Sequence, residues 1–566
     1  MINKQTIRSF FLCFLAFLGV FLYLSWKKDQ FEVTKINNGM SESFLPDPPH
    51  ENKASNSFNL DLPKVTESQD PSQNAENDSS SLSSIQVSTD TLNLTINSEG
   101  DITYLELKKY AKKQNDPANG FILFDRTQER HYVAESGLLA KQGPDSQILG
   151  RGKYSFSQKK YTMRESEDTI TVDMQLEGNR DVGVVKRFIF NRNSHLIHVE
   201  YLIDNRSQSL YTGNIWGRLK RKPENHSSSS IMGTMRSYLG GAIRGAEKKY
   251  LKVPFSDLDT KDFQQHVDGG WSAMVEHYFT SAWIPDPDQR NFYSGKKYTL
   301  DDSYGIGFVS PGVKIQPGQK ASIKASLYAG PAVSDTLSAI SPGLELTVDY
   351  GLLTVLCQPI FWLLKNLWLL TGNWGVAIIL TTLLIKLLFY RLSATSYRSM
   401  GNMRRLQPRI EALKEQYGED KQKFGQAMME LYRKEKINPL GGCLPILIQV
   451  PVFIALYSVL LESIELRQAP FFLWITDLSA KDPFYVLPFI MGISMLIQQK
   501  LNPTPPDPVQ AKVMMFMPIL FTFLFLQFPS GLVLYWVVNN VLSISQQWAI
   551  ARTINMKSKE KLVRAL

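Results

Sequence analysis

The stretch Trp374-Gly-Val-Ala-Ile-Ile-Leu-Thr-Thr-Leu-Leu-Ile-Lys386-Leu-Leu-Phe-Tyr-Arg391 is apolar for long enough to cross a bilayer, yet it contains a lysine. With a helical rise of about 1.5 Å per residue, Lys386 lies roughly 18 Å along the axis from Trp374. A lysine near the bilayer centre costs about 2.5 to 3.5 kcal/mol on insertion scales. The ten Val, Ile, Leu and Phe residues of the stretch offset that cost at about 0.3 to 0.6 kcal/mol each. The segment is therefore predicted to insert.

Two interpretations of Lys386 are open. Thr382 lies one helical turn before it, and Gly375 and Ser393 fall on the same face. In the first interpretation the lysine extends its ammonium to the nearby membrane surface. In the second it lines a hydrated cavity inside the membrane.

The chain has two unlike parts. It has 566 residues and a net charge of +9, and its apolar runs cluster after residue 350 and at the N-terminus. Three cysteines form no disulfide framework and no zinc spacing. His195 and His198 would point to opposite faces of a predicted strand. With no phosphate loop, H-E-x-x-H or acid pair, the sequence predicts neither a cofactor, nor a metal, nor an enzyme.

The first half predicts an anchored β-domain. Residues 1–30 hold an apolar run without a cleavage motif, which favours an N-terminal transmembrane anchor. Residues 31–85 are rich in Ser, Asn, Asp and Pro, which is typical of a disordered linker. Residues 86–335 show period-two alternation, which predicts a water-facing antiparallel β-sandwich. The alternating sets are Leu92, Leu94, Ile96; Ile170, Val172, Met174, Leu176; Ile197, Val199, Tyr201, Ile203; and Ile323, Ala325, Leu327.

The second half predicts membrane helices. Residues 344–370, with Trp362 and Lys365 among leucines, suit an amphipathic helix in the membrane interface. Further spans are predicted at 371–392, 443–462, 485–499, 512–528 and 531–551. The expected fold is therefore a polytopic α-helical membrane protein of six transmembrane helices, with an inserted all-β periplasmic sandwich.

The segment 393–440 is strongly basic and is predicted to be a cytoplasmic helical hairpin, with Pro408 kinking its first arm or marking the start of that arm. By the positive-inside rule, this loop places both termini in the cytoplasm and the β-domain in the periplasm. Its charges, with those of the basic tail 552–566, suit contact with anionic lipid or with ribosomal RNA. Membrane topology and contact with anionic lipid explain most of these basic residues.

Polar residues recur on two other predicted spans. Gln449 lies on the third, and the sixth carries on one face Trp536, Asn539, Asn540, Ser543 and Gln547. Because unpaired amides facing lipid are costly, these faces are expected to meet around Lys386 and line a hydrated groove. This expectation favours the second interpretation of Lys386.

Several motifs carry a family resemblance. The run Leu431-Tyr-Arg-Lys-Glu-Lys-Ile-Asn-Pro-Leu-Gly-Gly-Cys-Leu-Pro-Ile-Leu-Ile-Gln-Val-Pro-Val-Phe-Ile-Ala-Leu-Tyr457 resembles the signature of the YidC/Oxa/Alb membrane protein insertases. So do Phe528-Pro-Ser-Gly-Leu-Val-Leu-Tyr535 and Leu346-Thr-Val-Asp-Tyr-Gly351. The large β-domain is similar to that of the Gram-negative form.

The resemblance implies a five-helix core around a groove that receives the hydrophilic part of a substrate. Lys386 stands where the family usually has Arg, so the charge is kept and the bidentate fork is lost. Thr382 and Trp536 match substrate-contacting positions, and Trp536 replaces a common Tyr. Arg391 replaces a Pro, which would allow the helix to continue. The implied location is the bacterial inner membrane, and the implied partners are nascent membrane proteins, lipids, the Sec translocon and translating ribosomes.

Two rival functions predict other features. An anion transporter or channel would show inverted repeats and paired broken helices, which the sequence does not show. A periplasmic carbohydrate-active domain would show a carboxylate pair or a His dyad in a cleft.

Overall fold

The computed structural model describes residues 84–113, 116–127, 130–140, 144–145, 150–178, 181–223, 238–245, 249–417, 420–435, 444–502 and 508–563. The predicted anchor 1–30 and nearly all of the predicted linker lie outside these residues. The described chain forms two compact units. The β-unit holds the described residues up to Asp349 together with Leu460–Ala469, and the helical unit holds Tyr350–Val459 and the residues from Pro470 onward.

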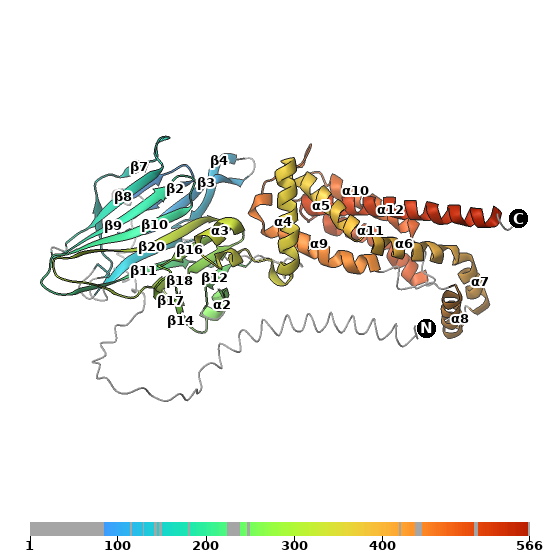
Figure 1. Cartoon of the computed structure of the whole chain (residues 1–566), viewed down its shortest axis with the longest axis horizontal. Coiled ribbons are helices and arrows are strands. Elements are labelled where there is room, and N and C mark those ends of the chain that lie inside the picture. The colour runs from blue at the N-terminus through green and yellow to red at the C-terminus, as the bar shows by residue number, and fades with distance from the viewer. Residues whose placement is uncertain are drawn as a thin grey trace, which may run out of the picture. The chain divides into compact units, whose positions relative to one another are not determined.

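The β-unit contains two sheets within the described residues (Figure 1). The 11-stranded sheet has the order β14-β17-β18-β11-β5-β3-β2-β1-β7, with β19 paired to β11 and β4 paired to β3. Its strands are β1 (Ile85–Ser88), β2 (Leu92–Ile96), β3 (Ile102–Lys113), β4 (Asp116–Phe124), β5 (Tyr132–Ala140), β7 (Lys160–Thr162), β11 (Tyr211–Arg221), β14 (Phe263–Asp268), β17 (Arg290–Tyr298), β18 (Ser303–Val309) and β19 (Val313–Ile315).

The 9-stranded sheet has the order β13-β12-β15-β16-β20-β10-β9-β8-β6 within the same residues. Its strands are β6 (Tyr154–Phe156), β8 (Thr169–Leu176), β9 (Val182–Asn191), β10 (Leu196–Asn205), β12 (Gly240–Ile243), β13 (Leu251–Val253), β15 (Ser272–Glu276), β16 (Phe279–Ile284) and β20 (Lys320–Pro331). The short helices α2 (Phe255–Leu258) and α3 (Ser334–Ile340) and the 3-10 turns η3 (Leu344–Thr347) and η6 (Ile464–Leu466) belong to this unit.

Period-two alternation builds the core of the β-unit. In β2, Leu92, Leu94 and Ile96 are buried while the residues between them are half-exposed, as the sequence predicts. One buried cluster takes side chains from both sheets, for example Leu94 of the first and Val199 of the second. The prediction of a β-sandwich is confirmed in its coarser form, a β-rich unit whose strands form two sheets. The pairing is not wholly antiparallel, because β1 and β7 run parallel.

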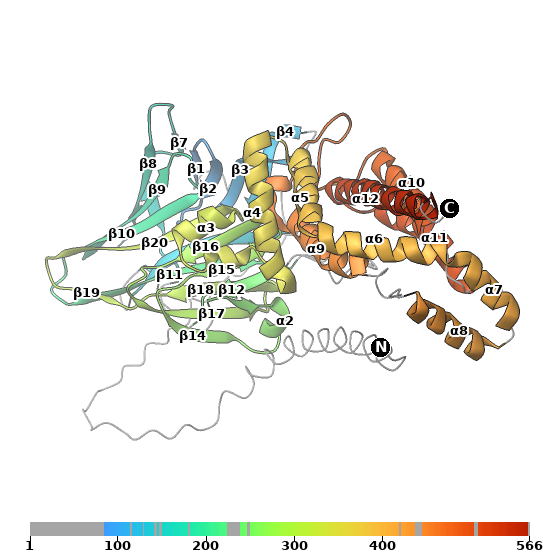
Figure 2. The same cartoon turned by 45° about the vertical axis from the view of Figure 1, so that its right-hand side comes forward.

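The helical unit holds α4 and the helices that follow it (Figures 1 and 2). They are η4 (Gly351–Leu353), α4 (Thr354–Thr371), α5 (Trp374–Leu388), α6 (Tyr390–Arg405), α7 (Gln407–Tyr417), α8 (Lys421–Lys434), α9 (Leu444–Glu462), α10 (Val486–Leu501), α11 (Pro508–Phe525) and α12 (Ser530–Val563). Taken singly, no helix of the described chain is both long and apolar enough to cross a bilayer, whereas α5 and α6 meet that requirement as a bent pair.

The predicted helix 344–370 begins later than the sequence suggests. Leu344–Thr347 and Gly351–Leu353 are 3-10 turns, and the α-helix α4 starts only at Thr354. Gly343 and Gly351 have φ values of 88° and 66°, in the left-handed region that a continuous helix does not use. Gly343 stands just before the predicted segment, and Gly351 interrupts it before α4.

The prediction of one helix over 371–392 is wrong. Asn373 caps α5 by accepting a hydrogen bond from the Val376 amide, but the helix ends at Phe389 and α6 departs at 70° (Figure 2). Replacement of the family's proline by Arg391 therefore does not keep the helix straight. The apolar run ends at this point, and α6 is amphipathic. It buries Ala394 and Tyr397 with Ile550 of α12.

The basic segment 393–440 begins within α6, and after Arg405 it forms the helices α7 and α8, which pack on each other (Figure 2). Pro408 lies in the first turn of α7, where its missing N–H costs nothing, so the prediction that it marks the start of an arm is confirmed. Asp420 caps α8 by accepting hydrogen bonds from two backbone amides. At the C-terminal end, α12 continues beyond the predicted span to Val563.

Close packing of α10 on α11 generates a prediction. A Cβ added at Gly492 of α10 would overlap Thr522 Oγ1 of α11, which is held in place by donating to the Pro518 carbonyl. Gly492→Ala should therefore destabilise the helical unit by about 1 to 3 kcal/mol, the usual cost of overpacking. The measurement is thermal unfolding of the detergent-purified protein. Adding Thr522→Ala should restore most of the stability that Gly492→Ala loses. A double variant no more stable than Gly492→Ala would show that Gly492 and Thr522 are not in close contact.

Candidate functional site

Lys386 is held by α12. Its Nζ donates a hydrogen bond of 2.8 Å to Ser543 Oγ, and the Ser543 hydroxyl donates one of 2.7 Å to the Asn539 carbonyl. Ser543 and Asn539 are buried at 2% and 6% exposure, and Lys386 is half-buried. We call these three residues the Lys386 cluster. Two helices far apart in sequence thus bring together residues that the sequence analysis had assigned to one site.

The Lys386 cluster holds an unbalanced charge. No ion pair within the described residues involves Lys386, and no charged group of that part of the chain acts on it. Among the described residues, its side-chain hydrogen-bond partner is the neutral hydroxyl of Ser543. An ammonium has three N–H donors, so the contact with Ser543 uses one of them.

Thr382 is buried one turn before the lysine. Its Oγ1 donates 2.7 Å to the Ile378 carbonyl of its own helix, which leaves the oxygen's lone pairs as acceptors. The neighbouring Thr381 is also buried, and its hydroxyl has no partner among the described residues. The sequence analysis named Thr382 and missed Thr381.

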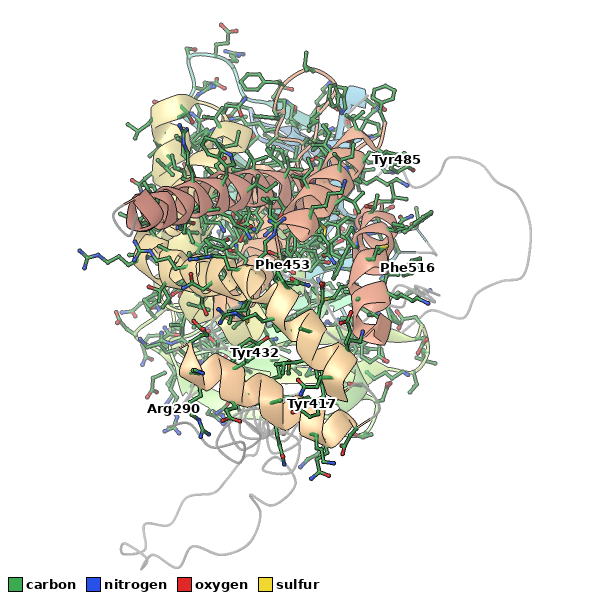
Figure 3. All side chains as sticks on the ribbon, turned by 90° about the vertical axis from the view of Figure 1, so that its right-hand side faces the viewer. Arg290, Tyr417, Tyr432, Phe453, Tyr485 and Phe516 are labelled. Carbon is green, nitrogen blue, oxygen red and sulfur yellow. The ribbon has the colours of Figure 1, made fainter. Side chains whose placement is uncertain are left out.

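Gln449 and Trp536 lie on α9 and α12. Gln449 Nε2 donates to the hydroxyl of Tyr535, a residue that the sequence analysis did not single out as part of the site. The Trp536 ring packs edge-on against Phe453 at 4.8 Å between centroids and also contacts Phe525 at 5.4 Å. Figure 3 labels Phe453 inside the helical unit. The structure therefore places these two predicted residues against the aromatic side chains Tyr535, Phe453 and Phe525.

Asn540 faces another helix. Its Nδ2 donates 2.9 Å to Ser494 Oγ of α10, and Gln547 Nε2 donates 3.2 Å to both the Leu501 carbonyl and Asn502 Oδ1. The sequence analysis assigned no site residue to the predicted span 485–499, so it missed Ser494. The polar face of α12 is thus divided, with Ser543 turned to α5 and Asn540 and Gln547 turned to α10.

Four uncharged polar atoms in this part of the helical unit are buried without a hydrogen-bond partner among the described residues. Such an atom costs about 1 to 3 kcal/mol unless water or a bound group satisfies it. Three of the four lie on α12 and one lies on α5. They are Thr381 Oγ1, Trp536 Nε1, Asn539 Oδ1 and Gln547 Oε1.

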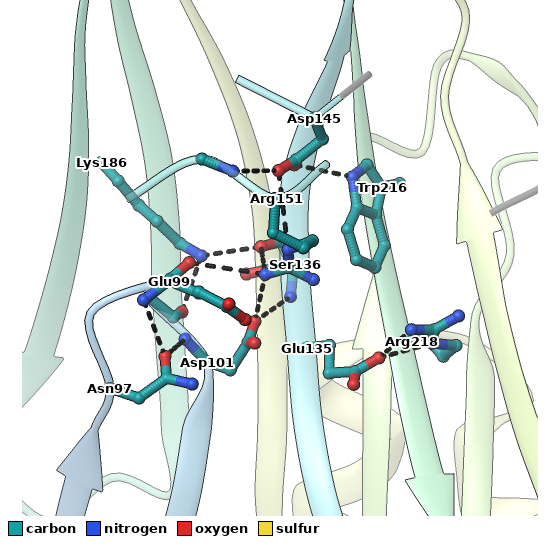
Figure 4. A network of polar contacts seen from close by, with 12 residues as sticks. Asn97, Glu99, Asp101, Glu135, Ser136, Asp145, Arg151, Lys186, Trp216 and Arg218 are labelled. Atoms are coloured by element: carbon teal, nitrogen blue, oxygen red, sulfur yellow. Dashed lines mark hydrogen bonds and ion pairs between the residues drawn. The ribbon is translucent and has the colours of Figure 1, made fainter. Parts of the chain in front are cut away.

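The β-unit holds a second polar network, most of whose members are buried (Figure 4). Lys186 Nζ of β9 donates to the Gly100 and Ser136 carbonyls at 2.6 and 2.8 Å, and three aromatic rings surround it within 6 Å of their centroids. Beside it, Arg151 pairs with Asp101 at 2.6 Å. Further along the same layer Arg218 pairs with Glu135, and Asp145 accepts from the Trp216 indole at 3.1 Å.

Burial sets the protonation of this network. Burial is the largest influence on Lys186 and lowers its pKa to about 7, while Asp101 opposes the shift. Arg151 lowers this pKa further, and Asp145 and Glu99 raise it. Burial also raises the pKa of Asp101. The network therefore encloses a lysine that is readily neutralised.

Sequence reasoning missed Lys186 although a signal was present. In β9 the residues Val182, Val184, Phe188 and Phe190 alternate as the inward set, and Lys186 occupies the same register. A period-two count places a lysine on the buried face at this point. Within the described residues, no group of three His, Cys, Asp or Glu side chains could hold a metal ion.

The chain matches known proteins along nearly its whole length. A family model described as 60Kd inner membrane protein matches residues 366–559, and one described as YidC periplasmic domain matches residues 84–363. A Pseudomonas putida (strain W619) protein named membrane protein insertase YidC is 48% identical over 556 residues, 98% of this chain and 99% of that protein. The chain belongs to the YidC family. A Stutzerimonas stutzeri (strain A1501) relative of the same name is 48% identical over 555 residues, again 98% of this chain and 99% of the relative.

Two solved structures are similar to this YidC family member. An active YidC insertase crystal structure is similar over 82% of this chain and 91% of that one, with 19% identity and a TM-score of 0.39. A galactose mutarotase-like protein from Lactobacillus casei ATCC 334 is similar over 44% and 99%, with 9% identity and a TM-score of 0.28.

The buried lysine of the β-unit predicts a pH dependence. Its folded pKa of about 7 lies below the ordinary 10.5, so between these values the unfolded chain binds more protons and stability rises with pH. Relative to Lys186→Met, the wild-type β-unit should gain about 1.4 kcal/mol per pH unit across this window. Pulse proteolysis of the full-length protein in urea and detergent from pH 7.5 to 9, scored on the β-unit, measures the difference. Parallel pH profiles for the two proteins would contradict the burial of a charge-shifted lysine.

Proposed function

We propose that this protein inserts integral membrane proteins into the bacterial inner membrane and helps them to fold. Relatives named membrane protein insertases support this proposal, since they align with the chain from end to end. The observation that carries it is the Lys386 cluster, in which a half-buried cation on the mostly apolar helix α5 is held by one neutral hydroxyl of α12. An enzyme that makes or breaks bonds is not required, and neither is a cofactor.

In this proposal the Lys386 cluster is the centre of a hydrated groove. Lys386, Thr382, Asn539 and Ser543 line its centre, and Gln449, Trp536 and Asn540 line its continuation toward α9 and α10. A wet cavity shortens the distance over which a hydrophilic tail must lose its water as it crosses. A carboxylate on that tail gains attraction to the Lys386 ammonium where the dielectric constant is low. The buried, unpartnered polar atoms of Thr381, Trp536 and Asn539 support such a site, because water or a client backbone would satisfy them.

The proposed topology has six spans, with both termini in the cytoplasm and the β-unit in the periplasm. The basic residues of α7 and α8 support this orientation by the positive-inside rule. The same surface would contact anionic lipid and translating ribosomes, and cooperation with the Sec translocon belongs to the proposal as well. The bend between α5 and α6 would place the basic face of α6 at the cytoplasmic surface.

The transporter alternative finds little support in the fold. Transporters of the inverted-repeat type pair two broken helices at a midplane site. Within the described residues one bent pair of apolar helices is present, α5 with α6. The contacts of Lys386 involve no second broken helix, because its partner Ser543 lies on the continuous α12.

Reversing the charge of Lys386 tests the function. Lys386→Glu should lower the insertion of a single-span client with a short acidic tail by at least about tenfold, since attraction becomes repulsion worth 1.4 kcal/mol or more. Lys386→Arg keeps the cation and should retain most of the activity. The measurement is protease protection of a radiolabelled client in liposomes that contain the purified protein. Equal insertion by wild type and Lys386→Glu would rule out a contribution of the Lys386 charge to insertion.

A further inference from the structure

The Ser543 hydroxyl has a fixed direction. Its proton is used in the 2.7 Å bond to the Asn539 carbonyl one turn earlier, so only its lone pairs face the 2.8 Å contact with Lys386 Nζ. Tyr397 of α6 lies near Ser543 as well, because α6 packs on α12. Three helices therefore meet at this single hydroxyl, which is 2% exposed.

The contact determines where the lysine ammonium lies. A lysine side chain has four rotatable bonds and a compact charge, and Lys386 is near enough to the end of α5 to extend toward the membrane surface instead. A neutral acceptor on α12 holds the ammonium in the interior without neutralising it. Two of its N–H donors then stay available, and Asn539 Oδ1, a buried acceptor without a partner among the described residues, lies one turn from Ser543.

We propose that Ser543 is a positioning residue: it holds the Lys386 ammonium on the α12 side of the site, with two donors free for a carboxylate of the client tail. The proposal rests on the insertase function argued above and makes that function selective for acidic tails. It also explains why a lysine can serve at this position. A guanidinium carries a planar fork of five donors and does not depend on one acceptor to be oriented.

A matched control lies on the same helix. Ser545 makes the same kind of bond, from its Oγ to the Val541 carbonyl at 2.8 Å, but it is exposed and far round the helix from Ser543. Ser545→Ala therefore removes an equivalent backbone-bonded hydroxyl without touching Lys386. Ser543→Thr keeps the hydroxyl and its bond to the preceding turn.

The experiment measures client insertion into liposomes that contain the full-length protein, with one client bearing two Asp in its tail and a matched client bearing two Asn. Ser543→Ala should lower insertion of the Asp client about fivefold, whereas the Asn client changes less than twofold. Ser543→Thr should restore the Asp client, and Ser545→Ala should leave both unchanged. When Lys386→Arg is already present, adding Ser543→Ala should lower insertion of the Asp client less than twofold relative to Lys386→Arg alone.

Three results would overturn the proposal. If Ser543→Ala lowered insertion of both clients equally, Ser543 would be a packing residue. The same would follow if Ser543→Ala lowered insertion of the Asp client as much in the Lys386→Arg protein as in the wild type. Full insertion of the Asp client by Ser543→Ala would show that Ser543 has no role in insertion. In each case insertion by the wild-type protein would leave the proposed function standing. Failure of the wild type to insert either client would instead contradict the insertase function itself.

Discussion

The hydrogen bond between Lys386 and Ser543 is the contact on which the helical unit's chemistry depends. A cation in an apolar segment is stable only when water or an acceptor solvates it, and here the described residues supply one neutral hydroxyl. That contact joins α5 to α12, and α12 joins α10 through Asn540 and Ser494. The charge remains unbalanced, so the same arrangement that secures the helices leaves an attraction for an acidic group.

The two units differ in the groups that surround a lysine inside the fold. Lys186 in the β-unit is enclosed by two backbone carbonyls and three aromatic rings, beside a carboxylate that opposes the lowering of its pKa. Its donors are engaged within the sandwich, which suits a structural role. Lys386 has a neutral partner and is only half-buried, which suits a role toward a mobile ligand. The distinction lies in the number of acceptors that the fold provides.

Local pattern predicted much of this structure, and tertiary geometry accounts for the rest. Alternation such as Ile170, Val172 and Met174 predicts the strands because one face of each sheet is buried. The sequence analysis missed the bend at Phe389. Beyond it, α6 buries its apolar face on α12, which lies about 150 residues further along the chain. Periodicity does not reveal a contact between segments so far apart. Ser494 was missed because one serine in an apolar run shows its partner only when α10 and α12 are side by side.

The central claim is that a client's hydrophilic tail passes beside the Lys386 cluster. The most direct measurement places a photo-crosslinker at Thr382, one turn from Lys386, and inserts a radiolabelled client with an acidic tail into liposomes holding only the purified protein. The account predicts protease-protected client together with tail crosslinks at position 382, and crosslinks that diminish when Lys386→Glu is added. Efficient insertion without any crosslink at this position would contradict it, because the tail would then take another route.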